Sequence, residues 1–98
     1  MAYTLLIPSS VKRDVKRLDK SVQRSLRDVH FPCLKADPRV GERLKGDLSG
    51  LHAYHFAQQG KQYRITYQVD EAEQAVVLVM VGTRGEFYEA LRRRLGMW

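Results

Sequence analysis

Apolar and polar residues alternate strictly along the stretch from Tyr63 to Asp70, and the rest of the chain can be organised around this stretch. The apolar positions are Tyr63, Ile65, Tyr67 and Val69. Because successive side chains of a strand point to opposite faces, this pattern predicts a strand with one buried and one open face. Arg64 falls between two apolar positions, so we expect it on the open face.

A second strand is predicted directly after the first. The run from Val76 to Val81 is apolar without alternation, which is typical of a strand covered on both faces, and a glycine ends it. The connection, residues 70–74, is short and polar, so we expect an antiparallel hairpin. The hairpin would bring Arg64 close to Arg84, and Tyr88 would share their surface.

Two further strands are predicted by the same alternation. One opens the chain at residues 3–7 and is closed by Pro8, because proline cannot continue the hydrogen-bond ladder. The other covers residues 51–57. Its bulky set, which we expect to face the core, consists of His52, Tyr54 and Phe56. His55 is then left on the open side of the sheet.

Two short helices are predicted between the first strand and residue 36. Ser9 or Ser10 can cap the first helix, whose apolar stripe consists of Val11, Val15 and Leu18. Asp19 can cap the second helix, whose stripe consists of Val22, Leu26 and Val29. Pro32 lacks an amide hydrogen, so we expect this helix to kink or stop near His30. His30 and the neighbouring Cys33 are expected to be packing residues.

A last helix is predicted over residues 86–95. Its inner stripe consists of Phe87, Leu91 and Leu95 or Ala90. Three arginines, residues 92–94, follow near its end, where cations interact favourably with the helix dipole. They could also form a docking patch.

Length and charge narrow the class of protein. The chain has 98 residues and a formal net charge of +6, so we expect one domain over residues 1–98 with a nucleic acid, the ribosome or an acidic protein as partner. A soluble basic domain without such a partner is the alternative. One cysteine gives no disulfide framework or metal spacing, and no apolar run approaches the length of a membrane span. We therefore expect a cytoplasmic protein without a membrane partner.

Three features of the central hairpin carry a family resemblance. They are the strand sequence YRITY at residues 63–67, the G-x-R end of the second strand at residues 82–84, and a tyrosine four residues after that arginine. This combination resembles the RelE/ParE superfamily of bacterial type II toxins. The resemblance implies an α+β fold of RelE-like microbial RNase type. Two N-terminal helices would pack on a mainly antiparallel four-stranded sheet, with a C-terminal helix at its end.

The resemblance also implies a function. Members close to RelE are ribosome-dependent mRNA endonucleases, and the favoured expectation is an mRNA interferase that cleaves mRNA in the ribosomal A site and so inhibits translation. ParE-like members act on DNA gyrase, which gives a second hypothesis. A third is a catalytically inactive module that still binds its antitoxin. An acidic antitoxin would neutralise the toxin by covering its basic surface or displacing the C-terminal helix.

Metal-independent RNA cleavage needs a base for the 2′-hydroxyl, cations for the charge on the phosphorane and an acid for the departing 5′ oxygen. Arginine stays protonated and binds phosphate with two parallel hydrogen bonds. Arg64 and Arg84 are therefore suited to stabilise the negative charge of the phosphorane. Tyr88 can stack on a base or hydrogen-bond the nucleophile. By resemblance these three match the catalytic residues of RelE-like toxins. No metal or cofactor is expected.

The chain departs from RelE at two places that bear on the general base. Ala53 and His55 stand where RelE has lysines, and Thr83 stands where many relatives have a histidine. Histidine side chains ordinarily titrate near pH 6.5, so an imidazole is a better base at pH 7 than a lysine amine. His55 is therefore the fourth candidate catalytic residue.

Basic residues outside the hairpin are candidates for contacts with RNA or the ribosome, including 16S rRNA. Lys45 and Arg43 belong to a segment, RLKG, that resembles a basic loop of RelE-like toxins. The first helix carries four more cations on one side, which are Lys12, Arg13, Lys16 and Arg17. This helix face either contacts ribosomal RNA or is simply solvated.

Overall fold

A five-stranded sheet forms the frame of the molecule. The computed structural model describes residues 2–83, 85 and 87–96. Within these residues the strand order is β1-β5-β4-β3-β2. The strands are β1 (Thr4–Leu6), β2 (Glu42–Arg43), β3 (His52–Gln58), β4 (Lys61–Asp70) and β5 (Ala75–Thr83). β1 runs parallel to β5, and the other neighbours are antiparallel.

The four predicted strands are confirmed, and β2 is a fifth that sequence reasoning left in a loop. Both residues of β2 are polar and exposed, so its two positions carry no pattern of burial. The strand forms because Glu42 and Arg43 pair with the beginning of β3. β2 is important below because Glu42 reaches the candidate site.

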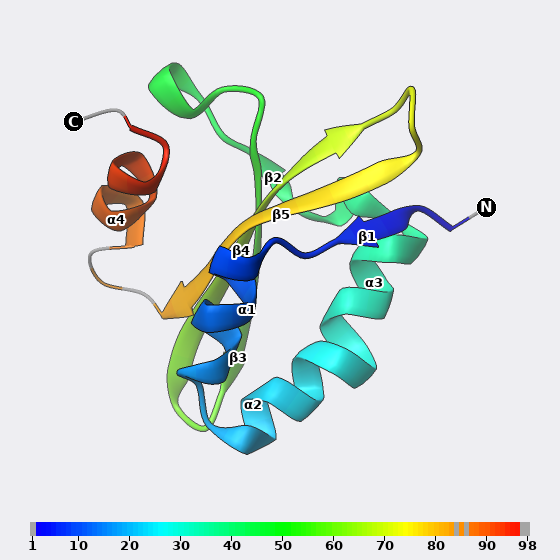
Figure 1. Cartoon of the computed structure of the whole chain (residues 1–98). Coiled ribbons are helices and arrows are strands. Elements are labelled where there is room, and N and C mark those ends of the chain that lie inside the picture. Colours follow the sequence, from blue (N-terminus) through cyan, green and yellow to red (C-terminus); the bar gives the residue numbers. More distant parts are fainter. Residues whose placement is uncertain (1, 84, 86, 97–98) are drawn as a thin grey trace.

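Helices lie on both sides of the sheet. They are α1 (Ser9–Lys16), α2 (Lys20–Ser25), the π turn η1 (Leu26–His30), α3 (Phe31–Ala36) and α4 (Phe87–Arg94). Figure 1 shows α1, α2 and α3 on one side of the sheet and α4 on the other. In the described part of the chain, every helix is too short or too polar to cross a membrane.

Each side of the sheet has its own apolar cluster. The larger, between the sheet and α1–α3, contains Tyr3, Val11, Val22, Leu26, Leu34, Tyr63, Ile65, Tyr67, Val76, Leu78 and Val81. The smaller, on the α4 side, contains Leu48, Phe87 and Leu91. The face predicted to be open is therefore open only in part, and Ala53 and Thr66, expected on that face, are buried.

The second helix was predicted to kink or stop near His30. It does not stop there, but an irregular π turn over Leu26–His30 interrupts the regular α-helix. The helix continues as α3 after the π turn, in which the Phe31 amide donates to the Leu26 carbonyl five residues back. A proline in a regular α-helix clashes with the carbonyl four residues before it. The wider turn just ahead of Pro32 changes the path of those carbonyls, so the helix can go on.

Smaller details of the helices also differ from expectation. Ser9 is already helical and Pro8 precedes it, without a side-chain hydrogen bond at the cap. Asp19 stands at the expected cap position of α2, but its side chain makes no capping bond. Val29, predicted on an inner stripe, is exposed, and of the two alternatives for the last helix Leu95 is exposed and Ala90 is half-buried. The helices are thus held by packing of their remaining apolar residues more than by caps.

A buried tyrosine hydroxyl ties the segment before β2 to the sheet. The Tyr67 hydroxyl donates to the Pro38 carbonyl at 2.6 Å and accepts from the Gly41 amide at 3.1 Å. Burial raises the pKa of Tyr67 to about 12. Gly41 has no side chain to displace this hydroxyl, and an added Cβ would collide with it.

We predict that Tyr67→Phe lowers the free energy of unfolding by about 1–3 kcal/mol, because a carbonyl and an amide lose their buried partner. Chemical denaturation measures this change. Gln68→Ala, at an exposed position of the same strand, is the control and should stay within about 0.5 kcal/mol of wild type. Equal stability of wild type and Tyr67→Phe would show that the two hydrogen bonds of the Tyr67 hydroxyl do not stabilise the fold.

Two partly buried histidines are expected to make the stability depend on pH. His30 stacks on Phe56 with ring centroids 3.8 Å apart, and its Nδ1 lies 2.9 Å from the Tyr54 hydroxyl. Burial lowers the pKa of His30. Burial and, second, the charge of Arg43 lower the pKa of His52.

We predict that the free energy of unfolding falls as the pH is lowered from 7.5 to 5. Both pKa values are depressed in the fold, so below about pH 6.5 the unfolded chain binds more protons than the folded one. Denaturation curves across this range measure the slope, and His30→Gln should reduce it. A stability that is constant over the range, or that rises towards pH 5, would refute the prediction.

Candidate functional site

The candidate site is built on a row of three paired residues of neighbouring strands, on the side of the sheet that faces α4. His55 of β3 pairs with Arg64 of β4, which pairs with Gly82 of β5. A Cβ on Gly82 would lie 3.3 Å from the Phe87 ring. The missing side chain therefore leaves room for the first residue of α4 to pack closely over this end of the row. Tyr88, the next residue, is thereby brought to the sheet surface.

Arg64 is the centre of the cluster. Its guanidinium carbon lies 5.1 Å from the centroid of the Tyr88 ring, within the range of a cation–π contact. Its Nε lies 3.4 Å from Nδ1 of His55, which is longer than a good hydrogen bond. The structure therefore brings together three of the four candidate catalytic residues: His55, Arg64 and Tyr88. Arg84, the fourth, lies outside the described residues.

Glu42 is a member of the cluster that sequence reasoning missed. Its Oε1 lies 3.6 Å from Nε2 of His55. The contact arises because Glu42 pairs with Ala53, two residues before His55 on the same face of the strands. Only recognition of β2 could have revealed it. The contacts of the two ring nitrogens favour the tautomer that carries its proton on Nε2 and presents a lone pair at Nδ1.

The predicted RNA-contacting residues are not gathered at this cluster. Arg43 lies beside His52, with which it lines a cavity of about 590 Å³. Lys45 is exposed and directly precedes the 3₁₀ turn η3 (Gly46–Leu48). The cations predicted on the first helix are exposed on the helix layer that covers the other face of the sheet. Three of them, Lys12, Arg13 and Lys16, belong to α1, and Arg17 directly follows it.

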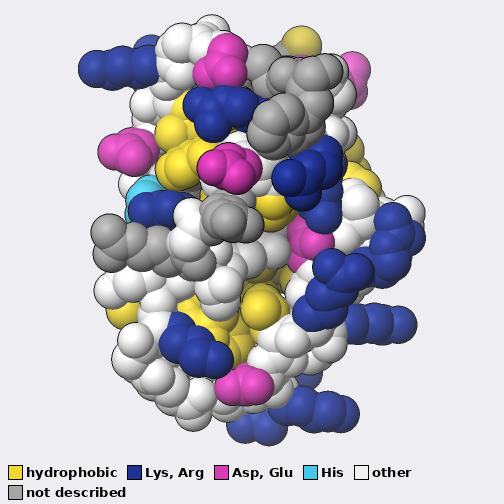
Figure 2. Space-filling model, turned by 90° about the vertical axis from the view of Figure 1, so that its left-hand side faces the viewer, with side chains coloured by type: hydrophobic (Ala, Val, Ile, Leu, Met, Phe, Trp, Pro, Cys, Tyr) yellow, Lys and Arg dark blue, Asp and Glu magenta, His cyan; other side chains and the backbone are white. Residues whose placement is uncertain are grey.

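Ion pairs within the molecule use several of the remaining charges. Arg92 contacts Asp47 at 2.8 Å, and Arg94 contacts Asp14 at 2.6 Å, so these two arginines are not a free docking patch. Figure 2 shows the α4 side with basic side chains interspersed with acidic ones. Among the described residues, no group of three or more His, Cys, Asp and Glu side chains is arranged to hold a metal ion.

Comparison with known proteins gives consistent matches. A family model described as ParE-like toxin of type II bacterial toxin-antitoxin system matches residues 5–92. Toxin RelE of Mycobacterium tuberculosis is 30% identical over 87 residues, which cover 88% of this chain and 86% of that protein.

Solved structures agree with this match. In the toxin-antitoxin complex RelBE2 of M. tuberculosis, the matched chain is 28% identical with a TM-score of 0.73, over 86% of this chain and 93% of that one. A mutant of E. coli toxin RelE in the free state is 20% identical with a TM-score of 0.75, over 96% and 94%. The second match shows the fold alone, and the predicted α+β fold of RelE type is confirmed. The chain therefore belongs to the ParE-like toxins of type II bacterial toxin-antitoxin systems, within the RelE/ParE superfamily.

Proposed function

We propose that the protein is a ribosome-dependent mRNA endonuclease that cleaves mRNA in the ribosomal A site and thereby inhibits translation. The observation that carries the proposal is the cluster of Glu42, His55, Arg64 and Tyr88 on one side of the sheet. It combines a cation, an imidazole with a carboxylate behind it, and an aromatic ring. RNA cleavage by the neighbouring 2′-hydroxyl requires a base and a cation, and the aromatic ring can stack on a substrate base.

Arg64 is proposed to stabilise the charge that develops on the phosphorane. Its Nε faces His55, so the two terminal nitrogens can donate to phosphate oxygens in parallel. A position on the middle strand of the sheet and the contact with Tyr88 restrict its motion. The restriction favours catalysis because the charge is already in position before the reaction. From the sequence, Arg84 is proposed to act alongside it.

His55 is proposed as the general base, with Glu42 behind it. The Glu42 carboxylate can accept from Nε2–H and stabilise the imidazolium that forms when Nδ1 takes the 2′-hydroxyl proton. The 2′-oxygen then attacks the adjacent phosphorus and the bond to the 5′ oxygen breaks. A 2′,3′-cyclic phosphate remains, and the departing 5′ oxygen takes a proton from water. The long Arg64–His55 contact can yield to substrate, since apo distances often tighten only in the complex. Tyr88 is proposed to stack on a substrate base.

Two partners follow from this proposal. The ribosome would orient the mRNA, with Lys45, Arg43 and the cations of α1 as its contacts. An acidic antitoxin is proposed as the second partner, because the chain has a net charge of +6 and the matched relatives include toxin-antitoxin complexes, among them the archaeal RelE-RelB complex from Pyrococcus horikoshii. Cytoplasmic localisation belongs to the same proposal.

We predict that Arg64→Ala lowers the rate of mRNA cleavage on purified translating ribosomes about 10²- to 10³-fold. Arg84→Ala should act in the same direction, and His55→Ala should lower the rate about 10²- to 10⁴-fold. Primer extension on a defined mRNA measures the rate and the position. Arg24→Ala, an exposed arginine of α2, is the matched control and should cleave like wild type.

Other outcomes of this assay would overturn the proposal in distinguishable ways. If Arg64→Ala and Arg84→Ala both cleave like wild type, the cluster is not the active site. If wild type leaves the mRNA intact while it still arrests growth, ribosomal cleavage is not the function. Accumulation of gyrase–DNA cleavage complexes in such cells would then identify a gyrase inhibitor.

A further inference from the structure

One edge of β5 is completed by side chains in place of a strand. β1 pairs with β5 only at residues 75–77. Further along that edge, Asp14 of α1 accepts from the Val81 amide at 3.1 Å. Arg94 of α4 donates to the Val79 carbonyl at 3.0 Å. The two side chains thus satisfy backbone groups that β1 does not reach.

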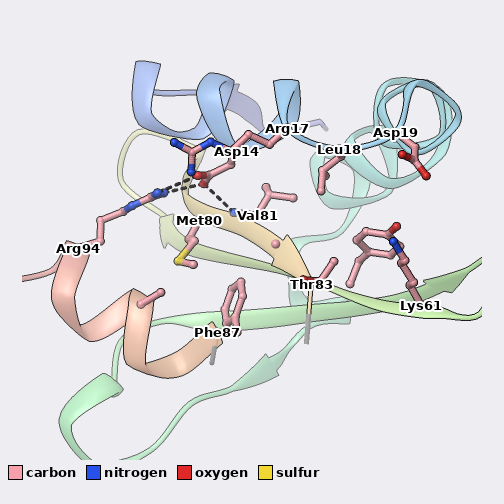
Figure 3. Close-up of a pocket in the computed structure, with 13 residues that line it drawn as sticks. Asp14, Arg17, Leu18, Asp19, Lys61, Met80, Val81, Thr83, Phe87 and Arg94 are labelled. Carbon is pink, nitrogen blue, oxygen red and sulfur yellow. Dashed lines mark hydrogen bonds and ion pairs between the residues drawn. The ribbon is translucent and has the colours of Figure 1, made fainter. Parts of the chain in front are cut away.

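Asp14 and Arg94 also bind each other directly. Arg94 donates to both carboxylate oxygens, with Nη1 2.6 Å from Oδ2 and Nη2 2.8 Å from Oδ1. The Asp14 side chain is only 7% exposed. Figure 3 shows Arg94 reaching from α4 to Asp14, with Val81 on the sheet between the two helices. We call this arrangement the Asp14–Arg94 clamp.

The clamp holds the end of α4 that is farthest from the candidate site. At the other end Phe87 packs against Gly82, and Leu91 is buried between the two ends. An isolated helix of eight residues is not stable in water, so contacts with the body of the protein must determine where α4 lies. Anchors at its first and last residues fix the direction of its axis.

We propose that Asp14 and Arg94 are positioning residues for RNA cleavage, because the clamp holds α4 in the orientation that sets the Tyr88 ring over the Arg64 guanidinium. This inference rests on the proposed function. Neither residue touches the cluster itself; the connection runs through α4, since Tyr88 directly follows Phe87 and packs edge-to-face on it at 5.5 Å. Loss of the clamp should release α4 and leave the β3–β4–β5 row of His55, Arg64 and Gly82 intact.

Amide hydrogen exchange tests the physical part of the inference. In Arg94→Ala we expect the amides of α4 and of Val81 to exchange about 100-fold faster than in wild type, because one partner of a buried ion pair is lost. Arg94→Lys keeps the charge but not the paired hydrogen bonds, so the exchange rate should rise by an intermediate amount. This variant replaces Arg94→Ala in the test if Arg94→Ala does not fold. Arg92→Ala removes only the exposed pair with Asp47 and should change exchange by at most about fivefold.

A double-mutant cycle tests the functional part. If the clamp acts through Tyr88, Arg94→Ala should lower kcat on the ribosome about 10-fold or more in the wild-type background but less than about threefold in a Tyr88→Ala background. KM should change much less than kcat. Equal effects of Arg94→Ala in both backgrounds would mean general destabilisation and would overturn the positioning role.

The two measurements separate this inference from the proposed function. Exchange in α4 that is unaltered by Arg94→Ala or Arg94→Lys would exclude the clamp, whatever the cleavage assay gives. Normal kcat in Arg94→Ala together with faster exchange in α4 would exclude its role in positioning while cleavage stands. Absence of cleavage by wild type would instead overturn the proposed function, and the positioning role with it.

Discussion

The buried carboxylate of Asp14 connects the two sides of the molecule. Asp14 lies on a helix that covers one face of the sheet, accepts from the backbone of β5, and is bound by Arg94 from the helix on the other face. A buried carboxylate is tolerated only when its charge is paired and its oxygens accept hydrogen bonds. The three donors to Asp14, which are the Val81 amide and the two terminal nitrogens of Arg94, therefore depend on one another. Removal of any one of them weakens the attachment of α4, and with it the contact between Tyr88 and Arg64.

The rest of the site depends on strand register. Residues 42, 55, 64 and 88 are far apart in sequence. They reach the cluster because β2 pairs with β3, β3 with β4 and β4 with β5, and because Phe87 packs α4 against Gly82 of β5. A shift of one residue in β3 would turn His55 to the helix side and bring Tyr54 or Phe56 to the open side. The aromatic packing of Phe56 on Tyr63 and His30 opposes such a shift. The packing on one face thus holds the candidate base on the other.

Sequence patterns predicted the elements whose residues alternate or repeat over several positions. The open-side positions of Arg64 and His55 followed from period-2 alternation. The hairpin of β4 and β5 followed from that alternation, a continuous apolar run and one short turn, and the resemblance drew attention to Tyr88. The pattern did not predict β2, which is too short to have a period, or the Glu42–His55 contact that depends on it. It also did not predict that Asp14 is buried, because this burial depends on Arg94, which is 80 residues away in the sequence. Nor did it predict the π turn that precedes Pro32 and lets the helix continue as α3.

The most direct test of the proposed chemistry uses an altered substrate. Ribosomes would be programmed with an mRNA that carries a single 2′-deoxynucleotide at the position where wild-type toxin cuts, and the products compared with those of the all-ribose mRNA. If the 2′-hydroxyl is the nucleophile, the deoxy substrate should stay intact and the ribose substrate should end in a 2′,3′-cyclic phosphate. Equal cleavage of both mRNAs would contradict the mechanism that the cluster of Glu42, His55, Arg64 and Tyr88 is proposed to perform.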